Sequence, residues 1–468
     1  MLLSFRLANF KSFRDEQAFS FVRGSYTTPV DETSEEGGKR PWDQRVGTIA
    51  GLYGSNASGK SNVLKALAFM RNAVRDSFQN WSPGSAIPTE PFKLDPMYKD
   101  EPSLFEVIFV LGKTRYQYGF RLTSKEVVGE WLYAYPSGRR QIWFERDISA
   151  DETYYFGKSF TGRNRVIADL TRPNALFLSA AVANNHKRVS MVDHWFSVHL
   201  TSVSPDDRPA RTQYTANMSD KTERWKQVTE LIQFADLGIC TARVRKEEIT
   251  ETERERLRRL LSAAALPGSN DERQIQQYLD RSSRVIEFGH SIGDSKEEPV
   301  YLPLNAESLG TQVWFSLVGP VIKAINNGDT LVVDELDASL HPHLTSEILK
   351  IFREPSQNSK QAQLIFTSHD TTLLGSMLGD KELRRDQVWF TEKKRDGASI
   401  LYPLTDFAPR KSENLERGYL QGRYGAVPYL DEEVLSDALS QTDSSELHDG
   451  VHDGVHDDNL GSVVDDPS

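Results

Sequence analysis

The segment GSNASGKS at 54–61 constrains the fold of this chain more than any other feature. Two glycines separated by four residues and followed by Lys and Ser form the template of a phosphate-binding P-loop. An apolar, strand-like segment, 46–53, precedes the loop, and the helical pattern NVLKALAFMRNAV follows it. This context favours a phosphate loop over a glycine-rich turn that binds nothing. The sequence therefore predicts a strand–loop–helix unit of an α/β nucleotide-binding domain.

Each residue type in the loop has a chemical task. The glycines let the backbone curl around phosphate oxygens, and the loop N–H groups and the helix N-terminus present positive partial charge. Lys60 adds a full charge at the β- and γ-phosphates, and the Ser61 hydroxyl is placed to ligate Mg²⁺. We therefore expect ATP and Mg²⁺ as ligands. The expected nucleotide-binding residues of this segment are Gly54, Asn56, Gly59, Lys60, Ser61 and Asn62.

A second motif, DTLVVDE at 329–335, reads as a buried strand that ends in two carboxylates. Branched apolar residues of this kind suit a parallel strand covered on both faces. Asp334 is then a candidate Mg²⁺ ligand, and Glu335 a candidate catalytic base that polarises the attacking water. The alternative is a plain strand end, and the phosphate loop upstream favours the functional interpretation.

Between these motifs lies ESLGTQ at 307–312, followed by the helical pattern VWFSLVGPVIKAI. A helix start with small residues is another anion site. The segment resembles the Ser-x-Gly-x-Gln signature of ABC-type ATPases. That resemblance implies that Ser308 and Gly310 contact the γ-phosphate held by the phosphate loop of a partner subunit. A capped helix start without this role is the alternative.

Three further segments carry the same resemblance. LDASLHP at 336–342 resembles the D-loop that crosses between the subunits of an ABC dimer, which makes Asp337 a candidate nucleotide-binding residue. The strand-like QLIFTSHD ends near His369, which resembles the switch histidine that contacts the γ-phosphate and reports its loss. NFKSF at 9–13 resembles the opening motif of the SMC- and RecF-like branch and implies that Lys11 and Ser12 lie near the nucleotide. The family's Q-loop glutamine is not assigned, and Gln117 and Gln141 are candidates without supporting context.

The separation of the phosphate loop from the signature-like segment far exceeds the ~30 residues of a βαβ unit, so we expect an insertion. Alternating patterns at Pro91–Gly119 and Glu126–Asp147 predict an antiparallel β-subdomain. Helical patterns predict a compact helical insertion. No heptad pattern is sustained over several repeats, so we expect no coiled-coil arm. The helical patterns cover Ser179–Trp195, Ser219–Ala235, Glu247–Ala265 and Asp271–Arg281.

The predicted fold class is α/β, a P-loop NTPase of ABC-ATPase type with an antiparallel β-subdomain and a helical insertion. We expect residues 1–200 to form an N-terminal ATPase lobe and 201–290 the helical insertion. Residues 291–430 are expected to form a C-terminal lobe with the signature, carboxylate, D-loop and switch segments. The acidic, low-complexity segment 431–468 is expected to be disordered.

Charge and cysteine usage exclude several classes of protein. The chain of 468 residues has a formal net charge of −11. Residues 431–468 contain nine Asp, three Glu and no Lys or Arg, so the remainder is close to neutral and its charge argues neither for nor against nucleic-acid binding.

The single cysteine, Cys240, allows no internal disulfide, and no apolar stretch reaches the ~20 residues of a membrane helix. We therefore expect a cytoplasmic protein without a membrane partner. His448, His452 and His456 are spaced as metal ligands, but the glycines between them favour a solvated tail.

As a whole, residues 1–430 resemble the OLD-like subgroup of ABC ATPases, which serve bacterial anti-phage and restriction-linked systems. FKSF, ELDASLHP, TSHD and GRYGAVP are most similar to RloA-type ATPases and to the ATPase half of the PARIS defence system. The Toprim nuclease domain of full OLD proteins is not found after residue 430. The resemblance implies a self-associating ATPase, an ATP-sandwich dimer or higher oligomer, that controls a separate effector nuclease of Toprim type, with DNA or a phage protein as trigger.

Two other functions remain open on the sequence. One is a RecF- or SMC-like DNA-repair ATPase that binds DNA without a toxic partner. The other is a transporter ATPase, which the inserted segment and the N-terminus do not favour.

Overall fold

The computed structural model describes residues 1–22, 46–235, 238–246, 250–263, 284–291, 298–376, 382–410, 413–429 and 431–440. The chain forms two compact units, Met1–Val427 and Pro428–Ser468. The first unit contains every expected site residue. Among the described residues no helix is long and apolar enough to cross a membrane.

A six-stranded sheet in the order β16-β15-β3-β14-β13-β9 forms the centre of the first unit. Its five strands from β15 to β9 are parallel to their neighbours, and β16 is antiparallel to β15. The strands are β3 (Ile49–Tyr53), β9 (Leu200–Val203), β13 (Thr330–Val333), β14 (Gln363–Thr367), β15 (Val388–Lys393) and β16 (Ser399–Pro403). Every residue of β3, β13 and β14 is buried, as a parallel sheet covered on both faces requires.

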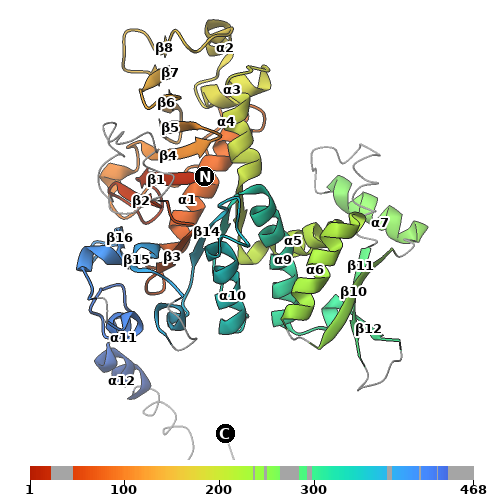
Figure 1. The fold of residues 1–468 in the computed structure, drawn as a ribbon. Coiled ribbons are helices and arrows are strands. Elements are labelled where there is room, and N and C mark those ends of the chain that lie inside the picture. Colours follow the sequence, from red (N-terminus) through yellow and green to blue (C-terminus); the bar gives the residue numbers. More distant parts are fainter. Residues whose placement is uncertain are drawn as a thin grey trace, which may run out of the picture. The chain divides into compact units, whose positions relative to one another are not determined.

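Alternate residues of these strands enter two different hydrophobic cores. Ala50 and Leu52 of β3 pack in the core that contains helix α1 (Lys60–Asp76). Ile49 and Tyr53 pack in the core that contains α9 (Leu309–Asn327) and α10 (Pro342–Arg353). Figure 1 shows α1 and α10 on different sides of the strands. The sheet is therefore the middle layer between two sets of helices.

A seven-stranded antiparallel sheet packs against α1 and shares its core. This sheet contains both segments in which the sequence predicts an antiparallel β-subdomain, so that part of the fold class is confirmed, as is the P-loop α/β core. Its strands are β1 (Leu2–Ala8), β2 (Gln17–Ser20), β4 (Ser103–Leu111), β5 (Thr114–Leu122), β6 (Val127–Tyr135), β7 (Gln141–Asp147) and β8 (Tyr154–Phe156). Three short helices follow it, α2 (Asn164–Leu170), α3 (Phe177–Ala183) and α4 (Ser190–His194).

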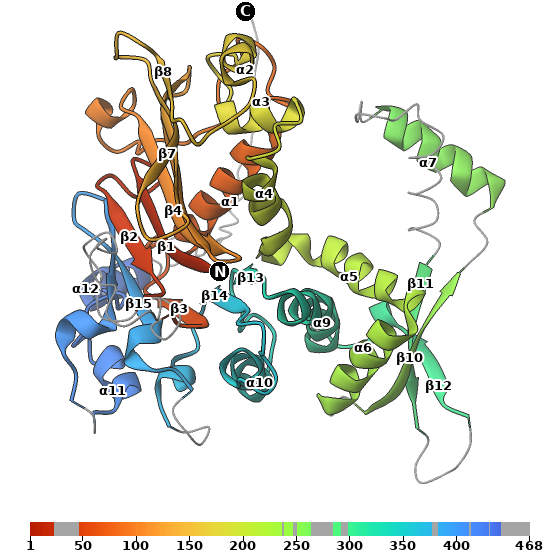
Figure 2. The same ribbon diagram turned by 45° about the horizontal axis from the view of Figure 1, so that its top comes forward.

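The next part of the chain contains α6 (Thr222–Phe234) and α7 (Glu251–Ala263), which lie in expected helical segments, together with a helix, α5 (Arg208–Ala216), and strands that the sequence analysis does not predict. The strands β10 (Ile239–Lys246), β11 (Arg284–His290) and β12 (Val300–Pro303) form an antiparallel sheet. Figure 2 shows this part beyond α9 from the central sheet. The helix expected at 271–281 lies outside the described residues.

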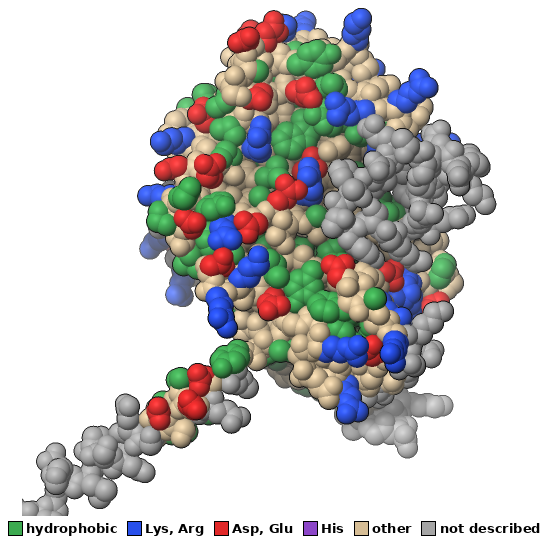
Figure 3. All heavy atoms as spheres, turned by 90° about the vertical axis from the view of Figure 1, so that its left-hand side faces the viewer, with side chains coloured by type: hydrophobic (Ala, Val, Ile, Leu, Met, Phe, Trp, Pro, Cys, Tyr) green, Lys and Arg blue, Asp and Glu red, His purple; other side chains and the backbone are tan. Residues whose placement is uncertain are grey.

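The surface on the side of the N-terminal strands mixes charges of both signs. Figure 3 shows Lys and Arg side chains interspersed with Asp and Glu side chains over this face, with apolar side chains between them. No broad surface of one sign is visible among the described residues of this face.

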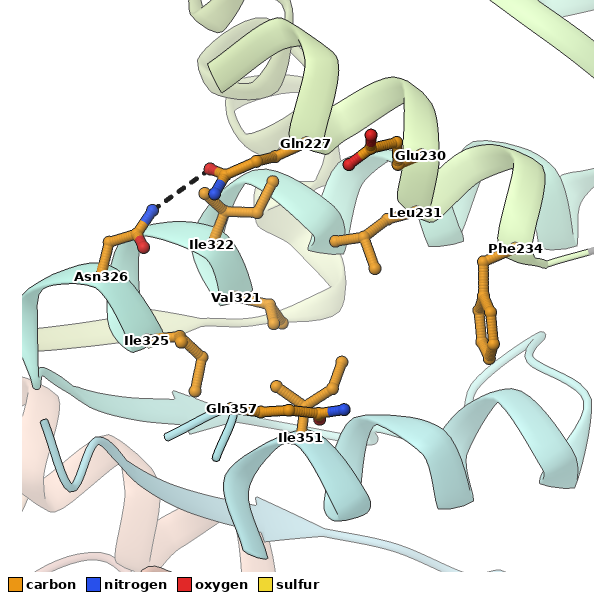
Figure 4. Close-up of a pocket in the computed structure, with 10 residues that line it drawn as sticks. All are labelled: Gln227, Glu230, Leu231, Phe234, Val321, Ile322, Ile325, Asn326, Ile351 and Gln357. Atoms are coloured by element: carbon orange, nitrogen blue, oxygen red, sulfur yellow. Dashed lines mark hydrogen bonds between the residues drawn. The ribbon is translucent and has the colours of Figure 1, made fainter. Parts of the chain in front are cut away.

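An apolar groove of about 320 Å³ lies where α6 crosses α9 near the end of α10. Figure 4 shows Leu231 and Phe234 of α6, Val321 and Ile325 of α9 and Ile351 of α10 pointing into it. The bond from Asn326 to Gln227 closes one end. The groove contains none of the expected site residues.

The C-terminal part corrects one expectation. Helix α11 (Leu415–Leu420) belongs to the first unit, and α12 (Glu432–Ser440) belongs to the second. Residues 432–440 are therefore helical, although their acidic composition predicts disorder, because Val434, Leu435 and Leu439 recur at helical spacing. Residues 441–468, with the three spaced histidines, lie outside the described residues.

Candidate functional site

The phosphate loop connects β3 to α1, and its glycines adopt backbone conformations that other residues avoid. Gly54 has φ 154° and Gly59 has φ 113°. A Cβ atom on Gly54 would lie 2.3 Å from the carbonyl oxygen of Thr391, and one on Gly59 would lie 2.7 Å from Oγ of Ser399. Both positions therefore require glycine for conformation and for space. Asn56 is exposed near the tip of the loop.

Lys60 is the first residue of α1 and is 6% exposed. Its Nζ donates hydrogen bonds to the backbone oxygens of Gly54, at 2.8 Å, and Ser55, at 3.1 Å. Burial lowers the pKa of Lys60, and the carboxylates of Asp334, Asp337 and Glu335 oppose this shift. The loop thus holds a cation beside a group of acids.

Ser61, the second residue of α1, meets Asp334, which follows β13. Oγ of Ser61 donates to Oδ1 of Asp334 at 2.9 Å. Among the described residues, no group of three or more His, Cys, Asp or Glu side chains is arranged to hold a metal. A hydroxyl and a carboxylate oxygen are ligands that Mg²⁺ accepts, and this ion commonly takes its other ligands from phosphates and water. The donor set therefore fits Mg²⁺ that is bound together with a nucleotide.

Thr367, the last residue of β14, links these groups, and the sequence analysis did not single it out. The register pairs Val333 with Phe366, which places Asp334 and Thr367 side by side. Oγ1 of Thr367 donates to Oδ1 of Asp334 at 2.7 Å and accepts from the backbone N–H of Glu335, also at 2.7 Å. In the sequence, only the position of Thr367 at the end of a strand near His369 could have identified this residue.

We expect Thr367→Val to lower the rate of ATP hydrolysis about tenfold, because two hydrogen bonds worth about 1 kcal/mol each no longer position the carboxylates. Phosphate release from ATP measures the rate, and thermal unfolding checks the fold. Thr367→Ser keeps the hydroxyl and should restore activity. A Thr367→Val protein with the activity of the unchanged chain would refute the positioning role.

Glu335 is exposed and has a φ of 54°. For a residue other than glycine this left-handed conformation is uncommon and strained. The hydrogen bonds from the N–H groups of Glu335 and Leu336 to Thr367 hold it in place. The backbone therefore turns sharply at Glu335 and leaves its carboxylate accessible.

His369 and Asp337 are joined through the backbone. The N–H of His369 donates to Oδ2 of Asp337 at 3.2 Å, and the His369 side chain is exposed. Oδ1 of Asp337 is buried, and among the described residues it has no hydrogen-bond partner. The imidazole is thus available to a ligand, while Asp337 connects the two segments.

The signature-like segment begins helix α9. Oγ of Ser308 caps the helix by accepting from the N–H of Thr311 at 3.1 Å. A Cβ atom on Gly310 would lie 3.0 Å from the backbone oxygen of Ser339. Within the described part of the chain, no hydrogen bond connects Ser308 or Gly310 to Lys60 or Ser61. Gly310 lies instead against Ser339 of the D-loop-like segment of its own chain.

The N-terminal motif reaches the phosphate loop through Ser12. Its Oγ accepts from Nδ2 of Asn62 and lies 2.8 Å from Oγ of Ser399. Lys11 instead forms an ion pair with Glu90, a residue that the sequence analysis did not predict in the site. This pairing lowers the pKa of Glu90.

The two Q-loop candidates lie in the antiparallel sheet. Nε2 of Gln117 donates to Glu106 at 2.9 Å, and its Oε1 accepts from Tyr135 at 3.0 Å. Gln141 begins β7. Among the described residues, neither glutamine has a hydrogen bond to a residue of the phosphate loop, so neither gains support as a Q-loop residue.

Comparison with known protein families finds a match over most of the chain. A family model described as "AAA domain, putative AbiEii toxin, Type IV TA system" matches residues 49–375, which include the phosphate loop, the signature-like segment and both carboxylates. None of the curated proteins matches the sequence.

Two solved structures of Smc heads are similar to the chain. One is an Smc head bound to the C-terminal winged-helix domain of ScpA, with 13% identity and a TM-score of 0.40, covering 90% of this chain and 99% of that one. The other is an Smc head with an extended coiled coil, bound to the C-terminal domain of ScpA derived from Pyrococcus furiosus. Its identity is 11% and its TM-score 0.37, with 95% and 99% of the two chains covered. Likeness at this level carries no argument about function.

Proposed function

The chain belongs to the AAA-domain family whose model covers residues 49–375, and from this premise we propose that it is an ATP-driven switch of a bacterial defence system. In this proposal it binds and hydrolyses ATP with Mg²⁺, associates with a second copy when ATP is bound, and controls a separate effector. The observation that carries the proposal is the cluster of Lys60, Ser61, Asp334, Glu335 and Thr367 at the ends of β3, β13 and β14. The AbiEii toxin and toxin–antitoxin description of the family supports a role in defence.

In the proposed mechanism each residue acts on the triphosphate or on water. The loop N–H groups and Lys60 bind the phosphates, which replace the backbone oxygens that Lys60 now contacts. Ser61 and Asp334 would hold Mg²⁺, which would neutralise charge on the phosphates. Glu335 accepts a proton from the attacking water. His369, whose side chain is exposed beside this cluster, contacts the γ-phosphate in this proposal.

Self-association is part of the proposal because Ser308 and Gly310 make no hydrogen bond to Lys60 or Ser61 of their own chain. In a two-fold dimer, the start of α9 of one copy would face the ATP held by Lys60 and Ser61 of the other. Its N-terminal N–H groups and the Ser308 hydroxyl would then bind the γ-phosphate. ATP would stabilise the dimer because it contacts both copies, whereas ADP lacks the shared phosphate. Lys11 and Asp337 are assigned to nucleotide binding as well.

A mixing experiment tests this shared site. We expect Lys60→Met and Ser308→Asp each to abolish hydrolysis, the second because a carboxylate would repel the γ-phosphate while it still caps α9. A mixture of the two inactive proteins should regain about a quarter of the normal activity, because half of the dimers are mixed and each contains one intact site. Ser308→Asn is the control that keeps the cap without the charge. If the mixture stays inactive although subunits exchange, the site is not shared.

The effector is proposed to be a separate Toprim-type nuclease. We assign no second catalytic centre to the described residues of this chain. A DNA-repair ATPase that acts alone is the alternative. The mixed charges in Figure 3 offer DNA no continuous basic surface on that face. Salt-sensitive DNA binding and DNA-stimulated hydrolysis by the purified protein, without a partner, would contradict the effector proposal.

A further inference from the structure

A cavity of about 120 Å³ adjoins Asp334 and Glu335, and the phosphate loop is not part of its wall. Arg208 and Arg211 of α5 line it together with the two carboxylates and Ser339. One water molecule needs about 10–15 Å³ of such space. The cavity is therefore large enough for a group of several heavy atoms.

The guanidinium groups of these two arginines have no protein partner among the described residues. Nε of Arg211 is buried and has no hydrogen-bond partner. Arg146 and Arg172 also have a buried Nε without a partner, but their terminal nitrogens donate to backbone oxygens. Among the described residues, neither Arg208 nor Arg211 makes a hydrogen bond or an ion pair through its guanidinium. A buried donor without a partner is unfavourable, and a bound acceptor would remove this penalty.

The charges of Arg208 and Arg211 favour an anion in the cavity. Arg208 and Arg211 occupy the first turns of α5, where the helix N-terminus adds positive partial charge. Burial lowers the pKa of Arg211, the nearby charge of Arg208 lowers it further, and Asp207 opposes both. Arginine nevertheless stays protonated. An anion between the two guanidinium groups would offset their repulsion.

The carboxylates of Asp334 and Glu335, which also line the cavity, limit which anion fits it. The carboxylates of Asp334 and Glu335 accept hydrogen bonds, whereas the arginines donate them. Hydrogen phosphate matches both walls, because its oxygens accept from the arginines and its P–OH group donates to a carboxylate. Sulfate carries the same charge but has no proton to donate at neutral pH, so its oxygens would face the carboxylate oxygens without a hydrogen bond between them.

We propose that the cavity between α5 and Glu335 binds inorganic phosphate and is where the product of hydrolysis is held before release. The inference rests on the proposed ATPase function. In that reaction the water oxygen bonds to the γ-phosphorus, and the bond from this phosphorus to the β,γ-bridging oxygen breaks. ADP leaves with that electron pair, Glu335 takes one proton of the water, and hydrogen phosphate forms beside the cavity.

Equilibrium dialysis of radiolabelled inorganic phosphate tests the proposal without hydrolysis. The protein is saturated with Mg²⁺ and ADP, so that ADP occupies the phosphate loop. We expect phosphate to bind, sulfate to compete at least tenfold more weakly, and Arg208→Gln with Arg211→Gln to weaken phosphate binding at least tenfold. Arg224→Gln, an exposed arginine of α6 outside the cavity, is the matched control and should change nothing. The double Arg→Lys variant keeps both charges and should retain most of the binding if the Gln variant unfolds.

Two results would overturn the inference. Phosphate affinity that is unchanged in a folded double Gln variant would exclude the cavity as the site. A selective loss of ATP affinity relative to ADP affinity in that variant would place the arginines on the nucleotide itself. If the unchanged chain binds no nucleotide at all, the proposed function fails instead, so the two failures are distinguishable.

Discussion

Glu335→Gln is expected to reduce ATP hydrolysis by roughly 100-fold or more while ATP binding persists. The amide has nearly the shape of the carboxylate, so the left-handed turn at this residue and the bond from its N–H to Thr367 are retained. The amide does not accept the proton of the attacking water. ATP should therefore remain bound and hold two copies together. Size-exclusion chromatography with light scattering, in the presence of Mg²⁺ and ATP, measures this association, and phosphate release measures the rate.

Glu354→Gln, an exposed glutamate after α10, is the matched control and should leave both measurements unchanged.

The trapped protein can also be used to isolate the effector, because the ATP-bound form should retain a bound nuclease through purification from its native host. Normal turnover by Glu335→Gln would remove Glu335 from the role of base. A protein that traps ATP but stays monomeric would contradict the shared site.

Lys60→Met is expected to weaken the binding of both ATP and ADP by about 10- to 100-fold, because one or more hydrogen bonds to a charged group, each worth about 1.5–3 kcal/mol, are lost. Methionine approximates the length of lysine but has no charge. The fold should survive, since the change removes a buried cation whose pKa burial already lowers. Titration with a fluorescent ATP analogue and the matching ADP analogue measures the affinities.

Lys65→Met, an exposed lysine on the same helix, is the control and should bind both nucleotides normally. Lys60→Arg keeps the charge, but the larger planar group does not fit the space between the oxygens of Gly54 and Ser55, so we expect only partial recovery. Nucleotide affinity that is unchanged in Lys60→Met would mean that the loop at 54–61 does not bind phosphate in this protein.

Local sequence accounts for the parts of the site that depend on local backbone geometry. Gly54 and Gly59 are recognisable because only glycine adopts their φ values without strain. Asp334 and Glu335 are recognisable because a short apolar strand ends at them. The antiparallel sheet is predictable from alternating residues in 103–147 for the same reason. In each case a few consecutive residues contain the signal.

Other groups of the site are brought together by strands and helices that are distant in sequence. Thr367 reaches Asp334 only because β13 and β14 are neighbours in a given register. Glu90 meets Lys11 through a contact between separate elements, and Arg208 and Arg211 line one cavity together with Glu335. The sequence analysis did not predict β10 and β11. Cys240, Ala242 and Val244 alternate with polar residues along β10, but β10 pairs with β11, a strand that is distant in the sequence.

The sequence by itself determined the phosphate loop, the pair of carboxylates and the type of fold, because each is encoded by residues that follow one another. Only the tertiary structure decided which side chains surround these motifs and which remain apart. It joined Thr367 to both Asp334 and Glu335 by hydrogen bonds, and it placed Gly310 against Ser339. The physical reason is that strand order and helix packing follow from burial of apolar faces over the whole first unit, and no short segment contains that information.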